Sequence, residues 1–222
     1  MLKPYFQNEL ITLYHGDCLE ITEWLEADVL VTDPPYGINW KGITTGLNKG
    51  YDKHKEGIAS DKNAEVRDKA LELWNGKPAV IFGSWRVERP SSTEHRLIWH
   101  KQGQAPGPLN APFMTQDEEI YILGKGFVST SPPMRSVITT KENRSTEVAK
   151  AGHPTPKPIG LMETLINRCP DGVIADPFAG SGSTLVAARN LGRKAIGVEL
   201  EEKYCELIAN RLSQEAFDLG GI

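Results

Sequence analysis

A carboxylate, two prolines and an aromatic ring follow one another directly after a short apolar run. The apolar residues 29–32 predict a buried strand, and Asp33, Pro34, Pro35 and Tyr36 come next. Asp33 can accept a hydrogen bond from an amino group, and because the prolines lack a backbone N–H, nearby carbonyl groups can face a ligand. Tyr36 offers a flat ring for stacking. These residues predict a binding pocket for a flat molecule that carries an NH2 group. A simple turn after a strand is the alternative.

A second group of residues has the pattern of a cofactor site. Residues 173–184 read as a strand, a tight glycine turn and the start of a helix. Gly180 and Gly182 let the backbone approach a ligand closely, and Glu199, at the end of the next strand, can accept two hydrogen bonds from a ribose diol. Such sites lie at the carboxyl ends of parallel strands. The pattern predicts a nucleotide-type cofactor.

Two details of this turn distinguish between cofactors. Leu185 replaces the third small residue of the dinucleotide fingerprint, and Asp176 and Phe178 stand where a pyrophosphate would approach. Both details count against NAD. The carboxylate of Asp176 suits an ammonium group better than a pyrophosphate. S-adenosylmethionine carries an adenosine and an amino-acid tail but no phosphate, and it fits this acidic turn better. A structural helix start without a cofactor is the remaining alternative.

Taken together, the two motifs carry a resemblance. The run 33–36, followed far downstream by residues 176–182, resembles the amino-group DNA methyltransferases, and the order of catalytic motif before cofactor motif is similar to their β class. Three further stretches match: residues 16–17, 153–158 and 197–199. The matches cover about half the chain, while residues 41–75 and 127–152 match no motif of the family.

The resemblance implies a role for each matching residue. Asp33, Pro34 and Tyr36 would hold the target base, Asp17 the adenine of S-adenosylmethionine and Glu199 its ribose. The glycine turn and Lys157 of the stretch 153–158 would surround the methionine part. They complete the cofactor set, which is Lys157, Asp176, Phe178, Gly180, Gly182 and Thr184. No metal is implied, and the product is S-adenosylhomocysteine. Pro156 stands where the family more often has Gln.

The chemistry expected at Asp33 is direct methyl transfer to an exocyclic amine. Such an amine is a poor nucleophile because its lone pair is delocalised into the ring. Our hypothesis is that Asp33 and the carbonyl of Pro34 accept its two N–H hydrogens and stabilise the positive charge that develops on nitrogen. Cytosine C5 methylation requires a cysteine nucleophile, and none of the three cysteines lies in a Pro-Cys turn.

More than one target base fits these residues. Asp33 resembles the adenine-specific group, whereas the cytosine-N4 group often has Ser there, so we expect a flipped-out adenine methylated at N6. The alternatives are an N4-cytosine DNA methyltransferase or an enzyme that acts on an RNA base or a protein glutamine amide. A different class is an inactive nucleotide-binding regulatory module.

Two basic stretches are expected to contact double-stranded DNA. Residues 41–60 predict a mobile loop that orders on DNA, and residues 127–152 predict a short target-recognition insertion. Arg can read guanine and Asn adenine in the major groove. Solvated loop charges or phosphate contacts are the alternative. The candidate DNA-binding residues are Lys41, Lys53, Arg135, Lys141, Asn143 and Arg144.

The composition of the chain limits the classes of protein to which it can belong. The 222 residues are 39% hydrophobic and 24% charged with a formal net charge of −4, which predicts one domain over residues 1–222 and argues against a protein coated with positive charge. No apolar run of about 18 residues and no signal peptide are visible, so a cytoplasmic protein without membrane contact, monomeric or homodimeric, is expected. The three widely spaced cysteines suggest neither a disulfide framework nor a zinc site.

The remaining pattern alternates strands with helices. Strands are predicted at residues 11–14, 29–31, 79–82, 96–99, 119–123, 172–175 and 194–198. Helices are predicted around residues 19–25 and over 61–74, 158–168 and 183–191, with a last amphipathic helix after 199. This alternation predicts an α/β fold with a three-layer, doubly wound, mostly parallel sheet. The resemblance adds a Rossmann-like methyltransferase fold with circularly permuted motif order.

Overall fold

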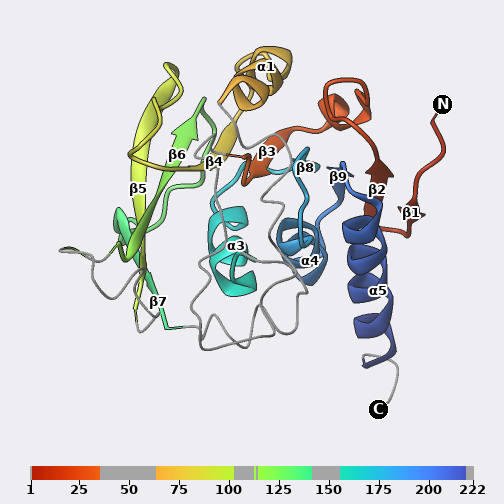
Figure 1. Ribbon diagram of the computed structural model, residues 1–222. Coiled ribbons are helices and arrows are strands. Elements are labelled where there is room, and N and C mark those ends of the chain that lie inside the picture. Colours follow the sequence, from red (N-terminus) through yellow and green to blue (C-terminus); the bar gives the residue numbers. More distant parts are fainter. Residues whose placement is uncertain (1, 36–63, 103–112, 114, 142–155, 219–222) are drawn as a thin grey trace.

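One sheet runs through the described part of the protein. The computed structural model describes residues 2–35, 64–102, 113, 115–141 and 156–218. Nine strands pair in the order β1-β2-β9-β8-β3-β4-β6-β5-β7 (Figure 1). The strands are β1 (Phe6–Gln7), β2 (Ile11–His15), β3 (Val29–Thr32), β4 (Ala79–Gly83), β5 (Thr93–Lys101), β6 (Asp117–Leu123), β7 (Val137–Thr140), β8 (Ile174–Asp176) and β9 (Ala195–Glu199).

The centre of the sheet is parallel. Strands β2, β9, β8, β3 and β4 all run in one direction, while β1 and β6 are antiparallel to their neighbours. All residues of β3 and β4 are buried, because a central parallel strand is covered on both faces. This is why the sequence shows both as unbroken apolar runs. The predicted mostly parallel α/β sheet is confirmed.

Helices cover both faces of the sheet and complete three layers. Figure 1 shows α1 (Glu65–Trp74) and the short 3₁₀ helix η1 (Glu23–Glu26) on one face, and α3 (Ile159–Ile166), α4 (Ser183–Asn190) and α5 (Glu202–Asp218) on the other. Trp24 of η1 and Trp74 of α1 stack on the first face with ring centroids 5.7 Å apart. Within the described residues, no helix has the length and apolarity needed to span a membrane.

Three local expectations differ from the structure. The helix expected around residues 19–25 is reduced to η1, because Asp17 begins a turn and the Trp24 indole donates to the Cys18 carbonyl at 2.9 Å. Strand β7 lies within residues 127–152, where a target-recognition insertion but no strand is expected, and the two-residue strand β1 is not among the predicted strands. Both are short edge strands with exposed residues, so neither shows a strong hydrophobic pattern. The loop expected before α1 lies outside the described residues.

The topology gathers the candidate residues at one edge. Because β2, β9, β8 and β3 are neighbouring parallel strands, their carboxyl ends share an edge, and the motifs follow those ends. Asp17 comes two residues after β2, Asp33 directly after β3, and Asp176 and Glu199 end β8 and β9. Strand β6 is antiparallel to β4, so its first residues begin at this edge too.

Candidate active site

Asp176 connects the two motifs that lie far apart in the sequence. The hydroxyl of Thr32, the residue before Asp33, donates to Asp176 Oδ1 at 2.6 Å, and the Phe178 amide donates to the same oxygen at 3.2 Å. Burial raises the pKa of Asp176 to about 6, against hydrogen bonds from Thr184, Thr32 and the Phe178 amide that lower it. The negative charge of Asp33 raises it further. A positively charged ligand group at this carboxylate would relieve that cost.

The glycine turn holds the carboxylate of Glu199. The Gly180 amide donates to Glu199 Oε2 at 2.7 Å, and the Glu201 amide donates to Oε1 at 2.8 Å. Burial raises the pKa of Glu199 to about 7, although these two amides lower it. An ionised carboxylate has about four acceptor positions, so two further hydrogen bonds are available to a ligand diol.

Gly182 is required for structural reasons as well. It has a φ of 77°, in the left-handed region that favours glycine, and it precedes the first residue of α4. A Cβ atom at this position would lie 2.8 Å from Ile208 of α5. The turn therefore needs glycine both for its backbone conformation and for the packing of the final helix.

Asp17 forms a turn beside this site. Its Oδ1 accepts a hydrogen bond from the Leu19 amide at 2.8 Å, and the Gly16 amide donates to the Glu199 carbonyl at 2.9 Å. The turn is thus tied to the end of β9, and Asp17 and Glu199 come from neighbouring strands. The arrangement fits an adenosine that spans β2 and β9.

Asp33 is half-buried and lies in a row of charged residues. The Lys157 ammonium donates to Asp33 Oδ2 and also pairs with Glu118 Oε2 at 3.3 Å, and Lys101 donates to the other oxygen of Glu118. Burial disfavours the charged form of Lys157, but the charges of Asp33 and Glu118 outweigh it and raise the Lys157 pKa. The same balance works in reverse for Glu118, where burial is outweighed by Lys157 and Lys101 and the pKa is lowered.

Glu118 and Lys101 are the members of this row that sequence reasoning missed. Residues 117–119 are all acidic and begin a strand that is otherwise apolar. Such an acidic start is a weak signal, because a solvated strand end shows it too. Only the pairing of β5 with β6, which sets Trp99 opposite Glu118, brings Lys101 within reach.

The predicted site residues fall into three groups. The structure brings together Asp33, Asp176, Phe178, Gly180, Gly182, Thr184, Glu199 and Lys157 around the carboxyl edge, with Pro34 buried beside them and Asp17 at the neighbouring turn. Lys141 and Arg135 are exposed but flank opposite ends of β7, so the structure does not bring them together. Tyr36, Lys41, Lys53, Asn143 and Arg144 lie outside the described residues.

This arrangement suits transfer to an amine. Asp33 is a carboxylate whose Oδ2 accepts a hydrogen bond from the Lys157 ammonium. With about four acceptor positions it can serve Lys157 and an amine together. The glycine turn on β8 lies next to it, since Thr32 joins the two strands.

Comparisons with known proteins agree with this geometry. A model of the DNA methylase family, which covers N6-adenine and N4-cytosine enzymes, matches residues 27–211. The type II methyltransferase M.ScaI of Streptomyces caespitosus is 27% identical, over 98% of this chain and 86% of that protein.

Two solved structures share the fold. The complex of M1.HpyAVI with S-adenosylmethionine has a TM-score of 0.63 at 24% identity, over 91% of this chain and all of that one. The cytosine-N4-specific PvuII DNA methyltransferase has a TM-score of 0.68 at 16% identity, over 93% and 88% of the two chains. Because the family model spans most of the chain, this protein belongs to the DNA methylase family of N6-adenine and N4-cytosine enzymes.

Proposed function

We propose that this protein methylates the exocyclic N6 amine of a flipped-out adenine in double-stranded DNA, with S-adenosylmethionine as methyl donor. The observation that carries the proposal is the contact between motifs that are 144 residues apart. The hydroxyl of Thr32 donates to Asp176, so the amine-binding carboxylate of Asp33 stands directly beside the glycine turn. Family membership supplies the reaction class, and Asp33 at the first motif position favours adenine over cytosine.

The proposed cofactor fits the residues at the carboxyl edge. Glu199 has acceptor positions for the ribose hydroxyls, and the buried, acidic Asp176 suits the ammonium of the methionine part. Lys157 can pair with the methionine carboxylate as well as with Asp33. Asp17, Phe178, Gly180, Gly182 and Thr184 complete the proposed set.

The mechanism follows from Asp33 and its neighbours. Bound S-adenosylmethionine supplies an electrophilic methyl group. Asp33 and the Pro34 carbonyl accept the two N–H hydrogens of the amine and stabilise the positive charge that nitrogen gains in the transition state. The methyl group would pass to nitrogen as its bond to sulfur breaks, S-adenosylhomocysteine would leave, and the methylated nitrogen would lose one proton to water. Positioning two reactants contributes about 7–11 kcal/mol, which outweighs the few kcal/mol needed to extrude a base. No covalent enzyme intermediate is required.

The direct test uses labelled S-adenosylmethionine with PCR-amplified genomic DNA, which carries no methylation. After digestion to nucleosides, we expect all label in N6-methyladenine. Label in N4-methylcytosine would overturn the choice of base. Label only in RNA or protein added to parallel reactions would overturn DNA as the substrate, and label nowhere would favour a regulatory module.

A substitution tests the role of Asp33. Asp33→Asn keeps the shape of the side chain but replaces one acceptor oxygen with a donor, and Asp33→Ala removes both oxygens. We expect both variants to lose transfer while S-adenosylhomocysteine binding, measured by calorimetry, stays within a few-fold of wild type. Near-normal DNA methylation by either variant would refute the assignment.

A further inference from the structure

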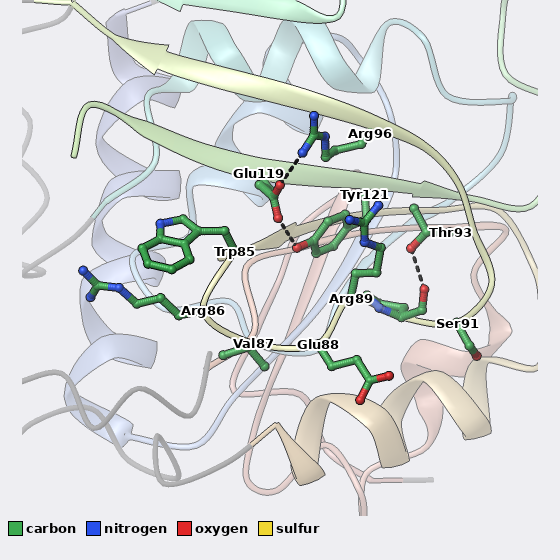
Figure 2. Close-up of a pocket in the computed structure, with 11 residues that line it drawn as sticks. Trp85, Arg86, Val87, Glu88, Arg89, Ser91, Thr93, Arg96, Glu119 and Tyr121 are labelled. Atoms are coloured by element: carbon green, nitrogen blue, oxygen red, sulfur yellow. Dashed lines mark hydrogen bonds and ion pairs between the residues drawn. The ribbon is translucent and has the colours of Figure 1, made fainter.

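A pocket outside the site described above opens beside the end of β4. The segment between β4 and β5 lines it together with side chains from the sheet face (Figure 2), and its volume is about 610 Å³. Tyr121 forms its inner wall, and its ring packs so closely over Gly83 that a Cβ there would lie 2.3 Å from it. The charged and aromatic lining residues besides Tyr121 are Trp85, Arg86, Glu88, Arg89, Arg96 and Glu119.

Within the part of the chain that the structure describes, some charged side chains that line this pocket form ion pairs and others do not. Arg96 Nη1 lies 2.8 Å from Glu119 Oε1, and Glu119 Oε2 accepts from the Tyr121 hydroxyl at 2.6 Å, so each oxygen of Glu119 has a partner. Among the described residues, neither Arg86 nor Arg89 forms a hydrogen bond or ion pair through its guanidinium. Glu88 is the one further acidic lining residue, and it is exposed. After these contacts the lining keeps a net positive charge.

An exposed aromatic ring stands beside these arginines. Trp85 is 65% exposed, with the Arg86 guanidinium carbon 5.3 Å from its ring centroid. In Figure 2 the indole extends away from Tyr121 at the rim of the pocket. By contrast, Trp24, Trp74 and Trp99 are buried. A large exposed ring next to arginines is the pattern of a surface that stacks on a base and neutralises phosphate.

The pocket lies at the same edge of the sheet as Asp33. In the parallel pairing of β3 with β4, Thr32 lies opposite Ile81. Asp33 and Pro34 therefore leave the sheet at the same edge, and from the neighbouring strand, as Gly83 and the segment that carries Trp85. The Asp33–Lys157 pair lies on the α3 face, where Lys157 also contacts Phe82, whereas Tyr121 and the pocket lie on the α1 face. The two sites thus flank one edge of the sheet.

We infer that the pocket between β4 and β5 is a contact site for the DNA substrate, in which Arg86 and Arg89 neutralise phosphates beside the target and the Trp85 indole stacks on a neighbouring exposed base. This inference rests on the proposed function and adds DNA-contacting residues to the candidates named from the sequence. DNA bound at this pocket would place its extruded base near Asp33, at the edge of the sheet where β3 and β4 end.

The test compares four single-residue variants in the full chain. Trp85→Ala is expected to raise the KM for PCR-amplified DNA about tenfold, and Trp85→Phe to restore most of the loss because a ring remains. Arg86→Gln and Arg89→Gln are each expected to reduce by about 1 the slope of log K against log salt for duplex binding, measured by fluorescence anisotropy. Affinity for S-adenosylhomocysteine should be unchanged in all four.

The matched control is Lys194→Gln. Lys194 is exposed and precedes β9, at the opposite edge of the sheet, so its loss removes one charge without touching the pocket. If the pocket variants match Lys194→Gln in KM and salt slope while wild type methylates DNA, the inference is wrong. If wild type itself neither binds duplex DNA nor transfers methyl groups to it, the proposed function has failed instead.

A spectroscopic measurement tests stacking directly. A base that stacks on Trp85 should quench part of the intrinsic tryptophan emission when duplex DNA is added, and Trp85→Phe should lose that part. Identical quenching in wild type and Trp85→Phe would overturn the stacking contact.

Discussion

Asp33 shows how a residue's chemistry depends on its neighbours. On its own it is a carboxylate in a proline-rich turn, able to accept hydrogen bonds from an amine. In the folded protein it pairs with the ammonium of the buried Lys157. A carboxylate acceptor at this position fits our hypothesis that the amine is stabilised as it gains charge. Because Thr32 contacts Asp176 of the glycine turn, the methyl donor is expected beside Asp33.

Glu199 leads to a prediction about pH. Its pKa of about 7 is raised by burial, and hydroxyl donors from a ribose favour the ionised form, so binding must lower that pKa. Affinity for S-adenosylhomocysteine should therefore fall as pH drops below about 7, by at most about tenfold per unit, and level off just above it. Asp176, with a pKa of about 6, should steepen the fall at lower pH.

Calorimetry between pH 5.5 and 7.5 measures this dependence. Glu199→Gln cannot ionise, so it should bind more weakly and lose the part of the pH dependence that Glu199 causes. An affinity that stays constant or increases as pH falls would contradict the role proposed for Glu199.

At the scale of elements, the alternation of apolar and polar runs was sufficient to predict most strands. Central strands such as β3 and β4 are unbroken apolar runs because both faces are covered. Edge strand β7 was missed because half of its residues face solvent and its pairing with β5 is not encoded locally. The acidic start of β6 was read only as part of a strand, although Glu118 joins β5 and β6 to the segment before α3.

The charged row around Glu118 predicts a pH-dependent stability. The Glu118 pKa is lowered from 4.5 and the Lys157 pKa is raised from 10.5, so their stabilisation is complete between about pH 5 and 10. It is lost as pH falls through the lowered Glu118 value or rises through the raised Lys157 value. Glu118→Gln should cost about 1–3 kcal/mol of unfolding free energy at pH 7.5, and this cost should shrink towards pH 3.5.

Thermal unfolding of both proteins across this range provides the measurement. Glu94→Gln, at an exposed position of β5, is the matched control and should unfold like wild type at every pH. A penalty for Glu118→Gln that is equal at all pH values would show that side-chain packing, rather than charge, is responsible.

At the scale of the whole molecule, the sheet order determines what the site can bind. Strands β2, β9, β8 and β3 place an acidic turn, a ribose-type acceptor and the Asp33 turn along one edge. The chain order of these strands differs from their order in space, so residues at both ends of the sequence meet there. A ligand that spans this edge should therefore stabilise the entire fold.

S-adenosylhomocysteine should raise the unfolding temperature accordingly. At about 100 times its Kd, a ligand adds about 2.7 kcal/mol, which for a domain of this size corresponds to about 5–10 °C. NAD at equal concentration should cause no shift, because Asp176 repels a pyrophosphate and Leu185 fills the place of a small residue. Differential scanning fluorimetry distinguishes the two ligands, and stabilisation by NAD alone would contradict the cofactor assignment.

The sequence by itself determined the α/β class, the parallel sheet and the two motifs, because residue type and periodicity are local properties of the chain. Asp33, Asp176 and Glu199 could each be recognised from their position at the end of an apolar run. The contact of Thr32 with Asp176, the partners of Lys157 and the pocket beside Trp85 depend on which strands are neighbours and on which face of the sheet each side chain lies. Strand order and face are decided by long-range packing, so only the tertiary structure revealed them.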